Sequence, residues 1–304
     1  MTIAIHDLAG ILLPTTTPFD PSGQICTADI TSNIKAWSAR GVTGFVVLGS
    51  TGERVHLDER EYLEVIEISR AASDLILIAG AGQQSTINTI KEIKRAAGVG
   101  AEAVLVITPH YYRPAITQET LLDYYKAVAD EAPVPVLLYS MPPLTGIKID
   151  PETVARLSEH PNIIGVKDSS NDIAGFRRTV ELCPNDFAVM TGNGTVLLDA
   201  LQAGAIGAIL AVGCVVPELC VEIFRAFSAQ EEGAERLQAE LSPLAAAVTT
   251  KYGIGGLKVA LDLAGYRGGA VRAPLRAPDE AARAEIKSLL DRITRFAELT
   301  GRIL

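Results

Sequence analysis

Short runs of Val, Ile and Leu alternate along the chain with longer stretches in which apolar residues recur at helical spacing. This alternation is typical of parallel βα units, because strands that are covered on both faces carry nearly continuous apolar runs. The predicted strands are Gly10–Thr16, Gly44–Leu48, Leu75–Ala79, Ala103–Ile107, Pro135–Tyr139, Ile163–Lys167, Phe187–Thr191 and Ala205–Leu210.

A helix is expected after each of these strands. Several helices begin with favourable residues: Asp58 stands three residues before Glu61, Ser85 can act as an N-cap, and Asp150 precedes Pro151. The predicted helices are Thr27–Arg40, Asp58–Ala72, Ser85–Gly98, Thr117–Asp130, Asp150–His160, Ile173–Cys183, Thr195–Ala203 and Pro217–Phe227. Eight such units in about 230 residues favour a closed (β/α)₈ TIM barrel, with an open doubly wound sheet as the alternative.

The strand pattern ends near residue 228, and the remainder of the chain has helical periodicity. Helices are predicted at Glu231–Thr249, Gly256–Leu263 and Asp279–Leu299, separated by a stretch in which Pro274 and Pro278 interrupt regular structure. We therefore expect residues 1–228 to form the barrel that carries the active site and residues 229–304 to form a C-terminal helical extension.

The composition narrows the class of protein. A chain of 304 residues with 48% hydrophobic content can bury a large core, and its net charge of −9 argues against binding nucleic acid through phosphates. The first ten residues lack a basic start and a long apolar core, and no apolar run reaches the roughly 20 residues that span a bilayer. We expect a cytoplasmic protein that binds neither nucleic acid nor membrane.

Metal ions and nucleotide cofactors are not expected. The four cysteines and four histidines are scattered without a zinc-binding or C-x-x-C spacing. A P-loop sequence is missing, and the stretch Gly192-Asn193-Gly194 lacks the third glycine of a dinucleotide-binding fingerprint.

Lys167 is the most informative candidate for chemistry. It ends the apolar run Ile163–Lys167, and active sites of TIM barrels lie at the carboxyl ends of the strands. Burial disfavours the charged form of a lysine side chain, and the neutral amine is a nucleophile toward carbonyl carbon. The alternative is a lysine whose stem is buried while its ammonium group reaches water.

Other polar residues follow neighbouring strands. Ser50 and Thr51 stand between two glycines, so their turn can direct amide and hydroxyl groups at a carboxylate, although an ordinary tight loop is the alternative. Tyr139 can act as a proton shuttle or as a core tyrosine with a satisfied hydroxyl. Tyr111 and Tyr112 fit either a site loop or an interface between subunits.

The residues from Pro14-Thr-Thr-Thr-Pro-Phe19 through Tyr252–Lys258 resemble the pyruvate-dependent class I aldolases and lyases that include dihydrodipicolinate synthase and N-acetylneuraminate lyase. The resemblance implies that Lys167 condenses with the keto carbon of pyruvate, without another cofactor, while Ser50 and Thr51 hold its carboxylate. It also implies that Tyr139 shuttles protons through Ser50 to Tyr111 of a neighbouring subunit.

The same resemblance implies that Gly192 and Ile209 line the pyruvate pocket. It further implies a homotetramer built from tight dimers, with a small 2-oxo acid as the substrate.

The second substrate depends on departures from the family pattern. Leu144 stands where the synthases carry an arginine for the carboxylate of the aldehyde substrate. The positions of that enzyme's lysine-feedback pocket are also a poor match; they are Arg54, Glu59, Tyr62, Gln84, Asn88 and His110. Stretches such as Thr108–Arg113 and Arg272–Leu275 are more similar to 4-hydroxy-2-oxoglutarate aldolase, and this similarity makes cleavage of 4-hydroxy-2-oxoglutarate to pyruvate and glyoxylate the reaction that we expect. That similarity makes Ser169 and Asn193 candidates for holding the distal carboxylate or hydroxyl.

Three alternatives stay open. One is condensation of pyruvate with aspartate semialdehyde, the dihydrodipicolinate synthase reaction. Another is an aldolase or dehydratase of 2-keto-3-deoxy sugar acids, because Thr51 replaces an asparagine of the most similar aldolases. The third is a non-catalytic sensor that binds a keto acid.

Overall fold

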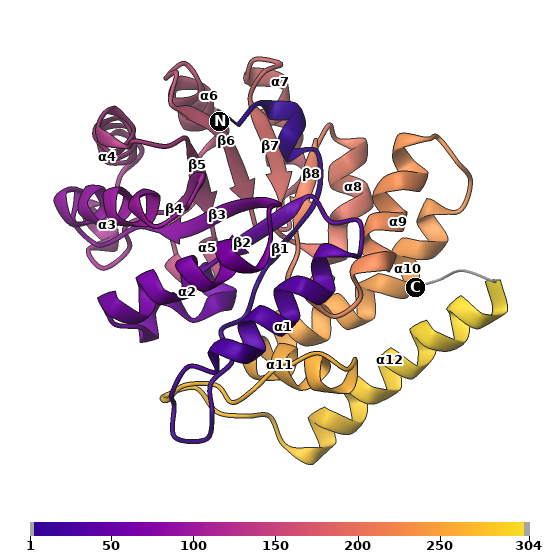
Figure 1. Cartoon of the computed structure of the whole chain (residues 1–304). Helices are drawn as coiled ribbons and strands as arrows, with labels where there is room; N and C mark the ends of the chain where they lie inside the picture. Colours follow the sequence, from indigo (N-terminus) through magenta and orange to yellow (C-terminus); the bar gives the residue numbers. More distant parts are fainter. Residues whose placement is uncertain (1–2, 301–304) are drawn as a thin grey trace.

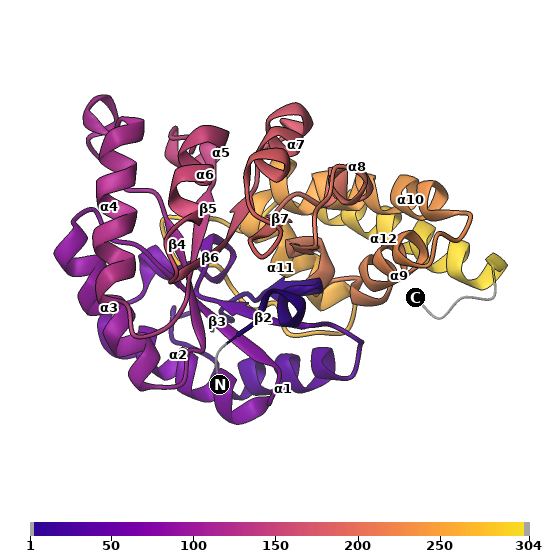
Figure 2. The same ribbon diagram turned by 90° about the horizontal axis from the view of Figure 1, so that it is seen from above.

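Eight parallel strands close into a barrel in chain order, with β8 hydrogen-bonded to β1, in a computed structural model that describes residues 3–300. This arrangement confirms the predicted (β/α)₈ fold (Figures 1 and 2). The strands are β1 (Gly10–Pro14), β2 (Gly44–Val47), β3 (Ile76–Ala81), β4 (Ala103–Ile107), β5 (Val136–Ser140), β6 (Ile163–Asp168), β7 (Ala188–Thr191) and β8 (Gly207–Ile209).

Helices follow the strands and surround the barrel (Figure 2). Asp58 and Ser85 accept hydrogen bonds from backbone amides of the first helical turns, as N-caps do. Asp150 makes no such side-chain bond, but Pro151 begins its helix as predicted. The helices are α1 (Thr27–Ser38), α2 (Glu59–Ala72), α3 (Thr86–Gly98), α4 (Gln118–Glu131), α6 (Pro151–Ser158), α7 (Ile173–Leu182), α8 (Leu197–Gln202) and α9 (Pro217–Ser228).

Most element boundaries differ from the predictions by one to three residues, and two of the differences have identifiable reasons. Strand β3 continues to Ala81, because Gly80 has no side chain: a Cβ there would collide with the backbone of Leu48 and Gly49. The chain also forms a short helix directly after β5, α5 (Pro142–Thr145), which was not predicted. Four residues are too few to show a helical period.

The inside of the barrel is filled by side chains from alternate strand positions. Leu12, Val46, Leu105 and Met190 belong to this buried cluster, and Tyr139 contributes its ring to the same cluster. Tyr139 and Lys167 are partners in the pairing of β5 with β6, so they lie at the same level of the barrel.

The C-terminal region packs beside α8 and α9 (Figures 1 and 2). It consists of α10 (Ala234–Ala246), a π-helical turn (Ala247–Lys251), α11 (Gly253–Leu263) and α12 (Glu280–Thr300). Gln238 on α10 donates to the carbonyl of Gly194 in the loop after β7.

The division of the chain into two domains at residue 228 stays a prediction, and residues 1–2 and 301–304 of those domains lie outside the described residues. Among residues 3–300, no helix combines the length and the apolar character that crossing a bilayer requires.

Candidate active site

Lys167 lies near the carboxyl end of β6 and is only 5% exposed. Its Nζ atom is 4.5 Å from the centre of the Tyr139 ring. Within residues 3–300 no ion pair joins it to a carboxylate. The amine is therefore buried at the active-site end of the barrel without an acidic partner.

The side chain of Tyr139 lies between this amine and the loop after β2. Tyr139 Oη lies 3.5 Å from Ser50 Oγ, at the long limit of a hydrogen bond. Catalytic hydrogen bonds are often long before substrate binds and shorten in the complex. Tyr139 thus lies between Lys167 and Ser50, as a proton relay requires.

Ser50 and Thr51 begin a 3₁₀ turn, Ser50–Gly52, immediately after β2. The first amide groups of a helical turn have no partner within the turn, so they are free to bind an anion. Ser50 and Thr51 also carry hydroxyl groups, and Thr51 is buried. The turn has the chemistry of a small carboxylate site.

Gly192 closes the site on the side of β7. A Cβ atom at this position would lie 2.5 Å from Lys167 Cε and closer still to Ser169 Oγ. Gly192, Ser169 and Lys167 therefore converge, and only glycine leaves room for the lysine side chain. Ile209 on β8 belongs to the same buried cluster as Tyr139.

Two further predicted site residues have other partners within this chain. Tyr111 is 74% exposed, and its ring packs edge-on against Tyr112 at 5.0 Å. No hydrogen bond joins Tyr111 to Ser50 in the described part of the chain. The side chain of Asn193 accepts from the amide of Thr195 in its own loop and donates to Asn171 in the loop after β6.

A cleft of about 780 Å³ opens from Ser50 and Tyr139 toward α2 and α3. Leu144 is 63% exposed and lines this cleft. The six positions compared with the lysine-feedback pocket also line it; they are Arg54, Glu59, Tyr62, Gln84, Asn88 and His110. Arg54 is not free to bind a ligand, since it pairs with Glu92 at 2.6 Å and donates to the carbonyl of Gly82.

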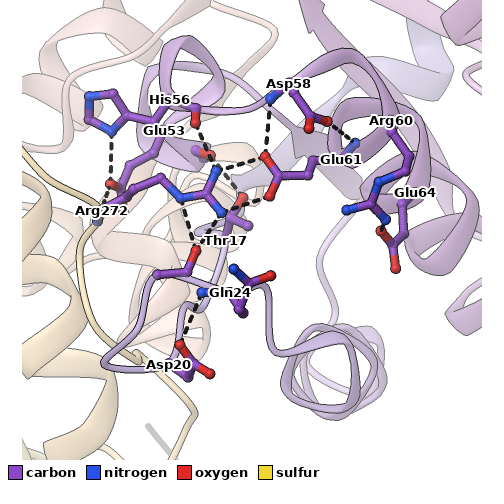
Figure 3. A network of polar contacts seen from close by, with 12 residues as sticks. Thr17, Asp20, Gln24, Glu53, His56, Asp58, Arg60, Glu61, Glu64 and Arg272 are labelled. Carbon is purple, nitrogen blue, oxygen red and sulfur yellow. Dashed lines mark hydrogen bonds and ion pairs between the residues drawn. The ribbon is translucent and has the colours of Figure 1, made fainter.

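Sequence reasoning missed a cluster of buried charges behind the Ser50–Gly52 turn. Glu53 pairs with Lys258 at 2.5 Å. Arg272 pairs with Glu61 at 2.7 Å (Figure 3). The hydrogen bond from Arg272 lowers the pKa of Glu61, whereas burial lowers the pKa of Lys258 despite the opposing effect of Glu53. One feature of the sequence could have indicated this cluster: Lys258 is the only charged residue in the apolar run Leu257–Leu261.

The carboxylate of Asp168, next to Lys167, accepts from the amide of Ser170 at 2.6 Å, as a local cap does. Burial raises the pKa of Asp168. Among residues 3–300, no group of three or more His, Cys, Asp or Glu side chains is arranged to hold a metal ion.

Comparison with known proteins finds sequence similarity over nearly the whole chain. The model of the dihydrodipicolinate synthetase family matches residues 7–293. A 4-hydroxy-tetrahydrodipicolinate synthase from Methanothrix thermoacetophila is 33% identical over 294 residues, which cover 96% of this chain and 98% of that protein.

Solved structures of proteins from this family share the fold of the chain. Dihydrodipicolinate synthase DapA-2 from Bacillus anthracis superposes with a TM-score of 0.90 at 31% identity, covering 96% of this chain and 99% of that one. YagE, a prophage protein of the same family from E. coli K12 that was crystallised with pyruvate, has a TM-score of 0.88 at 28% identity, covering 94% and 98%.

Proposed function

The chain belongs to the dihydrodipicolinate synthetase family of aldolase- and lyase-type enzymes, and from that premise we propose that it acts on pyruvate through an imine on Lys167. The observation that carries the proposal is the buried amine of Lys167, 4.5 Å from the Tyr139 ring, with Ser50 within reach of the Tyr139 hydroxyl. The crystallisation of the related YagE with pyruvate supports the choice of 2-oxo acid.

The chemistry follows from these groups. The Lys167 amine attacks the keto carbon of pyruvate to form a carbinolamine. Tyr139 donates a proton to the hydroxyl of the carbinolamine, so that water leaves and a protonated imine forms. The imine withdraws electrons, so the adjacent methyl carbon loses a proton and becomes a nucleophilic enamine. In the cleavage direction, the same electron flow breaks the carbon–carbon bond that the enamine would form.

Three further roles complete the proposal. Ser50 and Thr51 bind the pyruvate carboxylate through amide and hydroxyl groups, while Gly192 and Ile209 line the pocket. Tyr139 takes and returns the proton, a role that contributes on the order of 10²–10⁴-fold in rate.

The relay needs a third hydroxyl beyond Ser50. Tyr111 is exposed and makes no hydrogen bond to Ser50 within the described part of its own chain. As the family resemblance implies, we assign this role to Tyr111 from a second copy, and we expect tight dimers that assemble into a homotetramer.

The relatives favour aspartate semialdehyde as the second substrate. The curated relatives that match over most of the chain are named 4-hydroxy-tetrahydrodipicolinate synthase. On their example, the enamine on Lys167 would condense with the aldehyde carbon of aspartate semialdehyde. This is the first candidate.

One residue of the cleft favours a second candidate, cleavage of 4-hydroxy-2-oxoglutarate to pyruvate and glyoxylate. Leu144, in the wall of the cleft, cannot bind the carboxylate of aspartate semialdehyde. In this reading, Ser169 and Asn193 hold the distal carboxylate or hydroxyl. A Cβ atom at Gly192 would collide with the side chains of both Ser169 and Lys167, so these two side chains lie close together.

The test combines trapping with turnover. Borohydride reduction with pyruvate should add one reduced pyruvyl group at Lys167, and Lys167→Ala should abolish both the adduct and the activity. Turnover is then measured with aspartate semialdehyde plus pyruvate, with 4-hydroxy-2-oxoglutarate and with 2-keto-3-deoxy sugar acids. An adduct on Lys167 without turnover of any of these substrates would instead indicate a keto-acid sensor.

A further inference from the structure

The turn that carries Ser50 and Thr51 has a left-handed residue at each end. Leu48 has a φ of 58° and Glu53 a φ of 53°, and neither is glycine. Left-handed backbone is unfavourable for residues with a Cβ, so it persists only where the surrounding structure holds it. Both side chains are buried. Contacts inside the protein must therefore stabilise this turn.

Ionic contacts hold the end of the turn at Glu53. The carboxylate Oε1 lies 2.5 Å from Lys258 Nζ, and Oε2 accepts from the amide of Arg272 at 3.0 Å. Oε2 also lies 3.2 Å from Nδ1 of His56 (Figure 3). The side chains of Lys258 and Glu53 are 2% and 1% exposed. A charge buried this deeply is stable only when it is paired and hydrogen-bonded.

Lys258 is also connected to the turn indirectly, through hydrogen bonds that involve Thr17. Its ammonium donates to the carbonyls of Thr17 at 2.7 Å and Ala270 at 2.6 Å. Thr17 in turn donates its hydroxyl to the carbonyl of Gly52 at 2.8 Å. The ammonium thus donates two hydrogen bonds to backbone carbonyls and forms an ion pair with Glu53, so it is linked both to Glu53 and to the residue that binds Gly52.

We propose that the buried Glu53–Lys258 pair positions Ser50 and Thr51 to receive the pyruvate carboxylate, which makes both members of the pair positioning residues of the reaction. The inference rests on the proposed function, which assigns carboxylate binding to this turn. The competing explanation is that the pair only fastens α11 to the barrel. In that case its loss lowers stability without changing carboxylate recognition.

Pyruvate and acetone separate the two explanations. Both ketones can form an imine with Lys167, but only pyruvate has a carboxylate for the turn to bind. The measured quantity is the ratio of the second-order rate constants for borohydride trapping of the two ketones at Lys167, located by peptide mass. A merely structural role would not change this ratio.

Lys258→Met is expected to lower the pyruvate-to-acetone ratio at least tenfold, with trapping of acetone within threefold of wild type. The double variant Glu53→Gln/Lys258→Met leaves no unpaired buried charge, so it is expected to fold even where the single variant does not. It should show the same loss.

Glu61→Gln is the matched control. It removes the charge that pairs with the Arg272 guanidinium but leaves the Glu53–Lys258 pair and the Arg272 backbone amide that binds Glu53, so the melting temperature should fall while the ratio stays within twofold of wild type. A folded double variant with the wild-type ratio would overturn the inference, and so would an equal loss in Glu61→Gln. If wild-type protein traps neither ketone at Lys167, the proposed function is overturned as well.

Discussion

Replacing Gly192 by alanine tests whether the side chain of Lys167 must occupy the position described. The added Cβ would lie 2.5 Å from Lys167 Cε and closer still to Ser169 Oγ. Non-bonded carbon atoms pack about 3.5–4.0 Å apart, so the lysine side chain has to move by about 1 Å or more. Both colliding atoms belong to side chains that can rotate, so the fold can accommodate the change.

A displacement of about 1 Å at a reacting group costs roughly 10²-fold in rate, which corresponds to about 2.7 kcal/mol of transition-state stabilisation. Overpacking of this kind destabilises a protein by about 1–3 kcal/mol. We therefore expect Gly192→Ala to remain folded and to lose about 100-fold in kcat/KM.

The assay compares kcat/KM and melting temperature with those of Gly98→Ala. Gly98 ends α3, has no positive φ, and an added Cβ there would meet no atom within 4 Å. That control should keep wild-type activity. If folded Gly192→Ala stays within threefold of wild type, Lys167 is either not confined by Gly192 or not the reacting amine.

Three other changes probe separate parts of the account. Tyr139→Phe should reduce kcat by about 10²–10⁴-fold in steady-state assays while Lys167 still forms its adduct with pyruvate, and full activity would remove Tyr139 from the relay. Leu144→Arg should raise kcat/KM for aspartate semialdehyde about tenfold or more by supplying a carboxylate partner, and no change would mean that residue 144 does not contact the second substrate. Glu61→Gln should lower the free energy of unfolding above pH 4.5, because pairing with Arg272 lowers the folded-state pKa of Glu61 below its ordinary value of 4.5. The stabilising effect is lost as pH falls through that lowered pKa, so denaturant curves of variant and wild type should converge in acid; a constant difference would contradict the linkage.

Local sequence patterns were sufficient to predict the barrel. Apolar runs identify all eight strands because each strand is buried on both faces. Lys167 could be singled out for the same reason, since it is a charge at the end of such a run. Where a glycine interrupts the run, as at Gly80, the pattern ends before the strand does.

Contacts between distant segments could not be predicted. Lys258 and Glu53 carry opposite charges in separate elements, and nothing in the periodicity of either element indicates that they pair. The convergence of Ser169 and Gly192 on Lys167 also depends on how β6 and β7 lie side by side. The role proposed for Tyr111 requires a second chain, which the periodicity of one sequence does not describe.

The central claim is that Lys167 forms the imine with pyruvate. The most direct test is the mass of wild-type protein after borohydride reduction in the presence of pyruvate, followed by fragmentation of its peptides. The account predicts one reduced pyruvyl group per chain, located on Lys167. An adduct on a different lysine, or no adduct in folded protein, would contradict it.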